Sequence, residues 1–465
     1  MSSKPEHWHF IGIGGAGMSV LAHALLDRGA TVSGSDQGDS VALDGLRERG
    51  VAVRVGHDAA DPGLAAANHV VISAAVPETN PELAFARAAG TPVITRAALL
   101  GQLMDERTGI AIAGTHGKTT TTAMVTWVLR EAGRDPAFLI GGVLTDVGTG
   151  GHWGSGAELV AEADEYAGSF WELRPQVAVI TNLEADHLDF YGDLDAIRAS
   201  FRRFAGNLRP GGTLLLCGDD AGARQLYTAL CAADNTPGRY ALYGTTPDCA
   251  WQATGEAPNA GGGTDFVVQH SGAEVATMAL ALPGRHNVLN ALAAVGAAAA
   301  IGVAPAEAAV ALGRFHGTWR RFQVKGTTGG VLVVDDYAHH PTEIAATLAA
   351  ARRHLAGRRL VVVFQPHTYT RTQSFLAEFA TVLATADVAI ICEIYASRET
   401  DTLGLSSRQL VDQINALAPD RAAYAADLGA AARLASGLLQ SGDVLFTLGA
   451  GDVWQVGDTV LSSDF

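Results

Sequence analysis

The chain has 465 residues, 48% of them apolar, with 54 glycines and a formal net charge of −16. This length exceeds what one hydrophobic core usually supports and predicts about three domains of ~150 residues each. Because acidic residues are spread along the whole chain, the charge argues against nucleic acid and anionic membranes as partners. Four cysteines without paired spacing, and the lack of a signal core or a membrane-length apolar stretch, predict a cytoplasmic protein.

The first region, residues 1–106, predicts an α/β domain with a parallel sheet. We expect strands over 7–14, 31–36, 69–76 and 92–96, a helix over 16–29, and a helical connector ending near residue 106. Gly12, Gly14 and Gly17 form a GxGxxG pattern between the first strand and the helix, and Asp36 ends the second strand. The pattern predicts a diphosphate at a helix N-terminus, which a UDP-sugar would satisfy as well as NAD.

The second region, residues 107–323, begins with a strand over 109–114, the loop GTHGKTTTT and a helix from Thr119 to about Ala132. In such a loop backbone N–H groups surround phosphate oxygens, Lys118 reaches the β and γ oxygens, and Thr119 ligates Mg²⁺. The full Walker pattern requires glycine where this chain has Ile112. The alternative is an ordinary strand-to-helix turn with a solvated lysine, and His116 alone fits either interpretation.

Two polar clusters follow later strands of this region, at the sheet edge where ligands gather in α/β proteins. The first follows a strand over 158–164 and contains Glu162, Asp164 and Glu165. The second follows a strand over 177–183 and contains Asn182, Glu184, Asp186, His187 and Asp189. Carboxylates and a histidine suit Mg²⁺, although each acidic residue alone fits a helix cap or a solvated side chain equally well.

The rest of the second region predicts a helix near 193–206, a strand over 213–219, loops and short strands over 235–264, and packed helices over 285–313. The third region, residues 324–465, predicts strands over 331–340, 359–365, 388–395 and 443–449, with a helix over 341–355. Two of these strands precede polar residues that fit either an amino-acid site or a polar domain interface: Asp336, Tyr337, His339, His340, His367, Tyr369 and Arg371. The three regions together predict an α/β protein with three consecutive domains.

Eight motifs occur in the order seen in the Mur ligases: GIGGAGMS, GTHGKTTTTAM, EADE, TNLEADHLD, GRHNVLNALAA, FHGTWRRF, DDYAHHPTEI and FQPHTYTRT. The sequence resembles this family over essentially its whole length. Within the family, the last two motifs are similar to those of the members that join L-alanine to UDP-N-acetylmuramate with ATP and Mg²⁺. The resemblance therefore implies ATP-dependent amide ligation through an acyl phosphate.

The resemblance also implies a role for each domain. The N-terminal Rossmann-like domain would bind the UDP-sugar through Gly14, Gly15, Ala16, Gly17, Ser35, Asp36 and Ser73. The central P-loop domain and the start of the third domain would bind ATP through Gly114, Thr115, His116, Gly117, Lys118, Thr119, Thr120, His286, Asn287, Asn290, Arg320 and Asp336. The implied Mg²⁺ ligands are Thr119, Glu165 and His187. The C-terminal Rossmann-like domain would bind L-alanine through Tyr337, His339 and Arg371, and the implied catalytic residues are Lys118, His187, His339 and Arg371.

Some positions depart from the family pattern, and other interpretations remain open. Thr368 stands where an arginine is usual, and Tyr166 stands where the alanine-adding members commonly have serine. Tyrosine there resembles the ligase that recycles a whole tripeptide. An NAD-dependent oxidoreductase would explain GxGxxG but leaves GTHGKT without a purpose. A non-catalytic nucleotide-binding regulator would be expected to lack Lys118 or the metal ligands. The sequence leaves the oligomeric state open.

Overall fold

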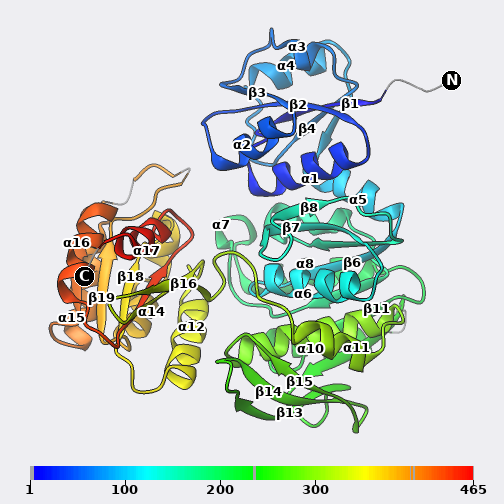
Figure 1. Ribbon diagram of the computed structural model, residues 1–465. Coiled ribbons are helices and arrows are strands. Elements are labelled where there is room, and N and C mark those ends of the chain that lie inside the picture. The colour runs from blue at the N-terminus through cyan, green and yellow to red at the C-terminus, as the bar shows by residue number, and fades with distance from the viewer. Residues whose placement is uncertain (1–4, 234–236, 398, 402–403, 464–465) are drawn as a thin grey trace. The chain divides into compact units, whose positions relative to one another are not determined.

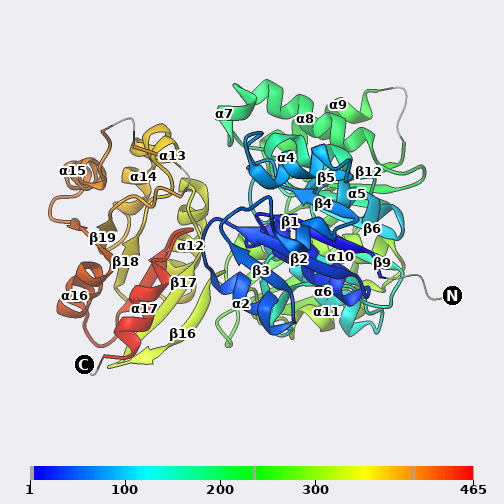
Figure 2. The same ribbon diagram turned by 90° about the horizontal axis from the view of Figure 1, so that it is seen from above.

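The computed structural model describes residues 5–233, 237–397, 399–401 and 404–463, and it forms three β-sheets with helices between the strands (Figures 1 and 2). The predicted α/β class is therefore confirmed, and the three sheets match the three predicted α/β regions. Its residues form two compact units, of which the first comprises Met1–Glu256, Asp265–Leu280 and Val288–His316, and the second comprises Ala257–Thr264, Ala281–Asn287 and Gly317–Phe465. The domain boundaries at 106 and 323 stay predictions.

The N-terminal sheet has five parallel strands in the order β3-β2-β1-β4-β5. Its elements are β1 (His7–Ile11), α1 (Ala16–Asp27), β2 (Thr31–Asp36), α2 (Val41–Glu48), β3 (Ala52–Val55), α3 (Pro62–Ala65), β4 (His69–Ile72), α4 (Pro81–Ala88), β5 (Val93–Thr95) and α5 (Arg96–Asp105). Chain order reverses at β1, because β2 lies on one side of it and β4 on the other. Such a switch point opens a crevice at the carboxyl ends of the strands, and the GxGxxG loop lies there.

The central sheet has ten strands in the order β15-β14-β13-β12-β11-β10-β6-β9-β7-β8. Its elements are β6 (Thr108–Ala113), α6 (Lys118–Glu131), β7 (Ala137–Leu144), β8 (Thr149–His152), β9 (Glu158–Glu162), the 3₁₀ helix η1 (Tyr166–Glu172), β10 (Val177–Ile180), α7 (Leu188–Tyr191), α8 (Leu194–Gly206), β11 (Thr213–Cys217), α9 (Ala221–Cys231), β12 (Arg239–Gly244), β13 (Trp251–Pro258), β14 (Thr264–His270), β15 (Ala273–Leu280), α10 (Arg285–Ala300) and α11 (Pro305–Leu312). The passage predicted as loops and short strands contains β12, with 6 residues, and β13, with 8 residues. Both strands belong to the central sheet.

Helix α1 fixes the N-terminal domain to the central sheet, because it packs on β7 and β8 (Figure 1). Its last residue, Asp27, accepts hydrogen bonds from His152 Nδ1 at 3.0 Å and from the Trp153 backbone N–H at 2.9 Å. The Trp153 ring also contacts two guanidinium groups, those of Arg28 at 4.7 Å and Arg107 at 4.3 Å. The helix that follows the glycine loop is therefore held at its far end.

The C-terminal sheet has six strands in the order β16-β17-β21-β18-β19-β20, with only the edge strand β16 antiparallel among the described pairings. Its elements are β16 (Gln323–Thr328), β17 (Val331–Asp336), α12 (Pro341–His354), β18 (Leu360–Phe364), α13 (Tyr369–Ser374), α14 (Leu376–Leu383), β19 (Val388–Cys392), α15 (Ser407–Leu417), β20 (Ala422–Ala425), α16 (Leu428–Leu438), β21 (Val444–Leu448) and α17 (Trp454–Leu461).

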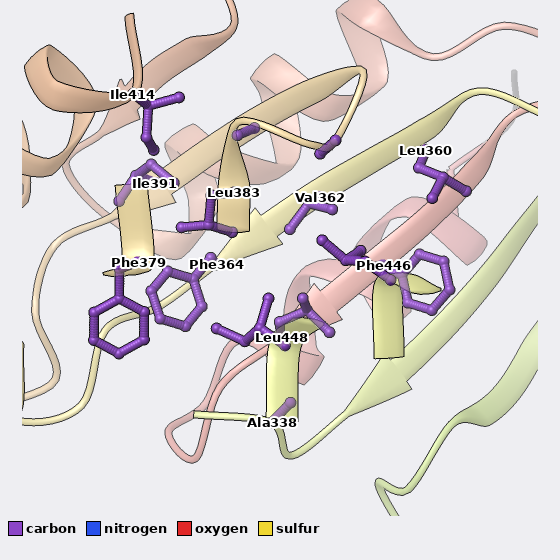
Figure 3. Close-up of a cluster of buried hydrophobic side chains, with 14 of the residues drawn as sticks. Ala338, Leu360, Val362, Phe364, Phe379, Leu383, Ile391, Ile414, Phe446 and Leu448 are labelled. Carbon is purple, nitrogen blue, oxygen red and sulfur yellow. The ribbon is translucent and has the colours of Figure 1, made fainter. Parts of the chain in front are cut away.

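Side chains of β18 alternate between the two faces of this sheet. Leu360, Val362 and Phe364 pack with α12, α14 and α15 on one face (Figure 3), whereas Val361 and Val363 pack with α16 and α17 on the other. Burial on both faces explains why this strand reads as a continuous apolar run rather than an alternating one. The polar residues that follow β17 and β18 therefore extend from a rigid layer.

A buried glutamate organises the interior of the N-terminal domain. Glu82 is fully buried in the first turn of α4 and accepts hydrogen bonds from the Ser35 hydroxyl at 2.5 Å and the Asp58 backbone N–H at 3.0 Å. His9 Nε2 lies 3.6 Å from the same carboxylate. Burial alone would raise the pKa of Glu82, but the contacts with His9, Ser35 and Asp58 outweigh it and lower the pKa.

We expect Glu82→Gln to destabilise the N-terminal domain by about 2 kcal/mol, because its buried donors lose a charged acceptor. The folded pKa lies below 4.5, so the stabilisation is present above that pH and is lost as the pH falls through the folded pKa. Hydrogen exchange of the β1 amides measures this opening free energy at each pH. The control is Glu78→Gln, at an exposed pair with Arg87; equal effects of the two substitutions would contradict the prediction.

Candidate active site

The loop before α6 has the backbone geometry of a phosphate-binding loop. Gly114 and Gly117 have φ values of 131° and 79°, in the left-handed region that favours glycine. A Cβ at Gly114 would lie 2.0 Å from Thr181 Oγ1, and one at Gly117 would lie 2.7 Å from Asn290 Oδ1. Gly117 caps α6 without a side-chain hydrogen bond, so the helix begins with backbone N–H groups open to an anion.

Lys118 pairs with Glu165 directly behind this loop. The ammonium Nζ lies 2.9 and 3.1 Å from the two carboxylate oxygens and also donates to the carbonyls of Gly114 and Thr115. Burial by itself would lower the pKa of Lys118, but the carboxylates of Glu165 and Asp164 outweigh it and raise the pKa. For Glu165, burial is the largest effect and raises its pKa against the attraction of Lys118. The lysine is charged and already positioned at the head of α6.

Two asparagines, one after a strand and one on a helix, hold the loop in place. The Asn182 side chain after β10 accepts from the His116 N–H at 2.7 Å and donates to the His116 carbonyl at 3.1 Å. Asn290 on α10 accepts from Thr121 on α6 at 3.1 Å. The sequence pattern grouped Asn182 with polar residues that suit Mg²⁺. In the structure its amide instead supports the backbone of the loop, because a neutral amide both donates and accepts hydrogen bonds.

His187 lies beside the Lys118–Glu165 pair, and its electrostatic effect opposes the rise that burial causes in the pKa of Glu165. Its backbone φ is 53°, and its N–H donates to Asp186 Oδ1 at 2.8 Å. The ring of Tyr166 meets the His187 ring edge-on at 5.0 Å, and Phe190 lies 6.2 Å from Tyr166. The side chain of Asp189, named in the same cluster, lies outside what the structure describes. The predicted metal ligands Thr119, Glu165 and His187 thus come from three segments of one domain.

The glycine loop of the N-terminal domain has the second open helix end. Gly12 has φ 81°, and the N–H groups of Gly12 and Ile13 donate to the Ser35 carbonyl at 2.8 and 2.9 Å. The Gly14 N–H donates to Asp36 Oδ2 at 2.8 Å, and Gly15 caps α1 without a side-chain hydrogen bond. The loop can therefore direct N–H groups at a diphosphate.

Two of the residues predicted for the UDP-sugar have partners inside the domain. The Ser35 hydroxyl lies within the buried Glu82 network, so only its backbone belongs to the loop surface. Ser73 accepts from the Ala75 N–H at 3.3 Å and shapes the turn after β4. Their contact with ligand stays a prediction, as does that of Gly14, Gly15, Ala16, Gly17 and Asp36.

Arg96 is a charged residue that the sequence analysis did not single out. It is the first residue of α5, its Nη2 donates to Asp164 Oδ2 at 3.0 Å, and a Cβ at Gly17 would lie 2.7 Å from its Nη1. An arginine about 80 positions beyond a glycine loop gives no local signal. Only the parallel sheet, which returns the chain to the same edge, brings the two together.

In the second unit, Asp336 ends β17 as a buried carboxylate. It accepts from the Phe322 N–H at 2.9 Å and the Ala338 N–H at 2.8 Å. Burial raises the pKa of Asp336 to about 6, although Arg321 and these two donors oppose the shift. The guanidinium of Arg321 lies 5.2 Å from the Tyr337 ring. Arg321 is therefore the arginine of FHGTWRRF whose charge acts on this carboxylate.

Arg320, the residue predicted for ATP, is only 3% exposed. Its guanidinium donates to Asp335 at 2.8 Å, Gly451 O at 2.8 Å and Gly449 O at 2.6 Å, all within the second unit. Two adjacent arginines give the same signal in a sequence, and only their surroundings distinguish them. The assignment of Arg320 to ATP stays a prediction.

His339 and Arg371 lie together after β17 and β18. Burial lowers the pKa of His339 to about 3, and Arg371 and His367 act in the same direction against Glu343. The imidazole Nδ1 lies 3.0 Å from the Tyr337 carbonyl, and the ring lies 6.0 Å from that of His367. Arg371 Nη1 lies 3.4 Å from the His367 carbonyl. The neutral histidine and the arginine therefore lie close enough to interact electrostatically, and their contact with L-alanine stays a prediction.

Thr368 replaces the usual arginine and has a local partner. Its hydroxyl donates to Glu399, which also accepts from the Thr370 N–H at 3.0 Å. The remaining ATP predictions, His286 and Asn287, are in the first turn of α10, where the Asn287 amide donates to the Pro283 carbonyl at 2.8 Å. Their contact with nucleotide stays a prediction. Among the described helices, none is both long and apolar enough to cross a membrane.

Known proteins resemble this chain along its whole length. Sequence models of the Mur ligase family catalytic domain, the Mur ligase middle domain and the Mur ligase glutamate ligase domain match residues 7–108, 112–298 and 320–451. The UDP-N-acetylmuramate–L-alanine ligase of Mycolicibacterium gilvum is 45% identical over 461 residues, covering 98% of this chain and 95% of that protein. The one of Mycobacterium avium is 45% identical and covers 100% of this chain and 96% of that protein.

Solved structures agree with these sequence matches. A UDP-N-acetylmuramate-alanine ligase from Thermotoga maritima has a TM-score of 0.81 at 28% identity and covers 98% of both chains. A murein peptide ligase from Psychrobacter arcticus has a TM-score of 0.72 at 27% identity with the same coverage. With its two glycine loops, its Lys118–Glu165 pair and these matches from end to end, the chain belongs to the Mur ligase family.

Proposed function

We propose that this protein joins L-alanine to the lactyl carboxylate of UDP-N-acetylmuramate in an ATP-dependent reaction of peptidoglycan precursor synthesis. The observation that carries the proposal is the pair of uncapped helix ends, α1 and α6, each preceded by a glycine loop in the same unit. One nucleotide-binding loop would serve an NAD enzyme, whereas two fit a ligase with a UDP-linked substrate and ATP. The names of the relatives that are 45% identical support the same substrates.

The reaction follows from the chemistry of the carboxylate. A carboxylate is a poor electrophile, so its oxygen attacks the γ-phosphorus of ATP and the bond to the bridging oxygen breaks, releasing ADP. Lys118, charged at the head of α6, offsets the repulsion between the two anions. The neutral amine of L-alanine then attacks the acyl phosphate, loses a proton, and phosphate leaves from the tetrahedral intermediate to give the amide.

Thr119, Glu165 and His187 would hold Mg²⁺. The set contains two oxygen ligands and one imidazole, and its carboxylate is buried beside Lys118, so the chemistry of the donors fits this ion. When bound, Mg²⁺ supplies positive charge at the phosphates. A triphosphate would offer Lys118 stronger partners than Glu165, which would release the carboxylate for the metal.

The C-terminal domain would bind L-alanine through Tyr337, His339 and Arg371. The guanidinium of Arg371 suits the carboxylate of a free amino acid, because its fork donates two parallel hydrogen bonds. The low pKa of His339 keeps its imidazole neutral at physiological pH, so it adds no charge that would compete for that carboxylate. A cytoplasmic location is part of the proposal, and the four free cysteines fit a reducing compartment.

The tripeptide-recycling alternative is less favoured, because the alanine-adding structure has the higher TM-score and the alanine-adding name recurs among the 45% identical relatives. The direct test measures phosphate release with UDP-N-acetylmuramate, ATP and Mg²⁺, comparing L-alanine, glycine, L-serine and the tripeptide. We expect L-alanine to give the highest kcat/KM. A preference for the tripeptide would overturn the assignment within the family.

Lys118→Ala should lower ligation at least about 10²-fold, because the charge at the transferred phosphoryl group is lost. UDP-N-acetylmuramate binding should stay near the wild-type Kd, since the other glycine loop is unchanged. Calorimetry with UDP-N-acetylmuramate and a phosphate-release assay measure the two effects, and retained binding also shows that the variant folds. Equal loss of UDP-sugar affinity would contradict the division of the two nucleotides.

Glu165→Ala and His187→Ala should each raise the Mg²⁺ concentration needed for half-maximal activity by about tenfold, because each removes one metal ligand. Magnesium titrations of the ligation rate measure this shift. Matched controls are Glu131→Ala and His316→Ala, at surface ion pairs with Arg314 and Asp146. If all four variants keep the wild-type magnesium dependence, the ligands lie elsewhere.

Arg371→Lys should raise the KM for L-alanine about 30-fold and leave that for ATP nearly unchanged. The loss corresponds to about 2 kcal/mol, as expected when a forked charge-assisted contact becomes a point contact. Steady-state kinetics with each substrate varied give both constants. Arg352→Lys, at an exposed pair with Asp387 in the same domain, is the control. A rise in the KM for ATP alone would move Arg371 to the nucleotide.

A further inference from the structure

The guanidinium of Arg96 lies against the first turn of α1. A Cβ on Gly17 would stand 2.7 Å from its Nη1 and 3.3 Å from its Cζ, so the guanidinium approaches the backbone as closely as only glycine permits. Arg96 begins α5 after the cap Thr95, and its side chain is 22% exposed. A positive charge therefore stands beside the first turn of α1, the helix that follows the glycine loop.

The other side of Arg96 is held by a carboxylate of the central domain. Nη2 donates to Asp164 Oδ2 at 3.0 Å, while Asp164 Oδ1 accepts from the Tyr166 N–H at 3.1 Å. Asp164 precedes Glu165, whose carboxylate pairs with Lys118. Arg96 is thus bonded to the residue that directly precedes the carboxylate partner of Lys118.

We propose that Arg96 binds the diphosphate of the UDP-linked substrate and that Asp164 positions it for this task. The inference rests on the proposed function and names a further substrate-binding residue for it. The glycine loop already carries one negative charge, that of Asp36, so helix N–H groups alone would meet a dianion beside a carboxylate. The guanidinium of Arg96 offsets that repulsion and has donors left over from its bond to Asp164.

The pairing of Arg96 with Asp164 predicts different effects on diphosphate affinity when the charge of one or the other is removed. A bond to Asp164 orients the guanidinium, but the carboxylate also attracts the charge that a diphosphate would use. Removing the charge of Asp164 should therefore leave diphosphate affinity unchanged or improve it, whereas removing the charge of Arg96 should weaken it. An ion pair that served folding alone would respond in the same way to either change.

The test is calorimetry of the full-length protein without ATP, with UDP and UDP-N-acetylmuramate as separate probes. Arg96→Gln should raise the Kd for both probes by about tenfold or more, and Arg96→Lys should restore part of the loss, because a charge remains without the fork. Asp164→Asn should keep both Kd values within about twofold of wild type or below. Arg87→Gln, at an exposed pair with Glu78, is the matched control and should change neither.

Equal weakening by Arg96→Gln and Asp164→Asn would overturn the proposal in favour of a structural ion pair. A loss confined to UDP-N-acetylmuramate, with UDP unaffected, would also overturn it, since the charge would then serve the sugar. The wild-type protein separates this result from the proposed function. A wild type that binds neither probe overturns both, whereas a wild type that binds and an Arg96→Gln variant that matches it overturn the role of Arg96 alone.

Discussion

The buried pairing of Lys118 with Glu165 is the interaction on which the central site depends. A lysine at the head of a helix would lose its charge on burial if nothing opposed the desolvation, and a neutral amine could not offset phosphate repulsion. Glu165 keeps the ammonium charged and close to the loop, while its own carboxylate is kept from water. The strands β6 and β9, which precede the two residues in the chain, are neighbours in the sheet, so the pair is a direct result of strand order.

Two separate sheets each present a helix end that is suited to a phosphate. Each glycine loop follows the first strand of its own sheet and leads into a helix that no side chain caps. An anion completes such a helix end, because it accepts from the free N–H groups and interacts favourably with the helix dipole. The same physics in two sheets supports the two phosphate sites of the proposed function, and the remaining residues of each domain would decide which phosphate ester fits.

Local patterns in the sequence carried most of this information. The P-loop with its helix and the strands before Glu165 and His187 are each formed by one unbroken stretch of the chain. Spacing and apolar runs therefore predicted each of them close to its observed place. The contacts of Arg96 and Arg321 could not be predicted in this way. Arg96 meets Gly17 only after β1, β4 and β5 have paired. Arg321 differs from Arg320 only in which of the two has buried carbonyls to bind. Burial of Ser35 likewise depends on Glu82, which is 47 residues away.

The packing of α1 on the central sheet has a consequence for dividing the chain into fragments. Val20 of this helix lies against Gly150 and Gly151 of β8, and Asp27 accepts hydrogen bonds from His152 and Trp153 of the central domain. A fragment that stops at residue 106 would keep the glycine loop but would lose β7 and β8, which cover that helix. Its newly exposed apolar surface would favour self-association. An N-terminal domain produced alone would therefore need polar substitutions on the exposed face of α1 to stay soluble.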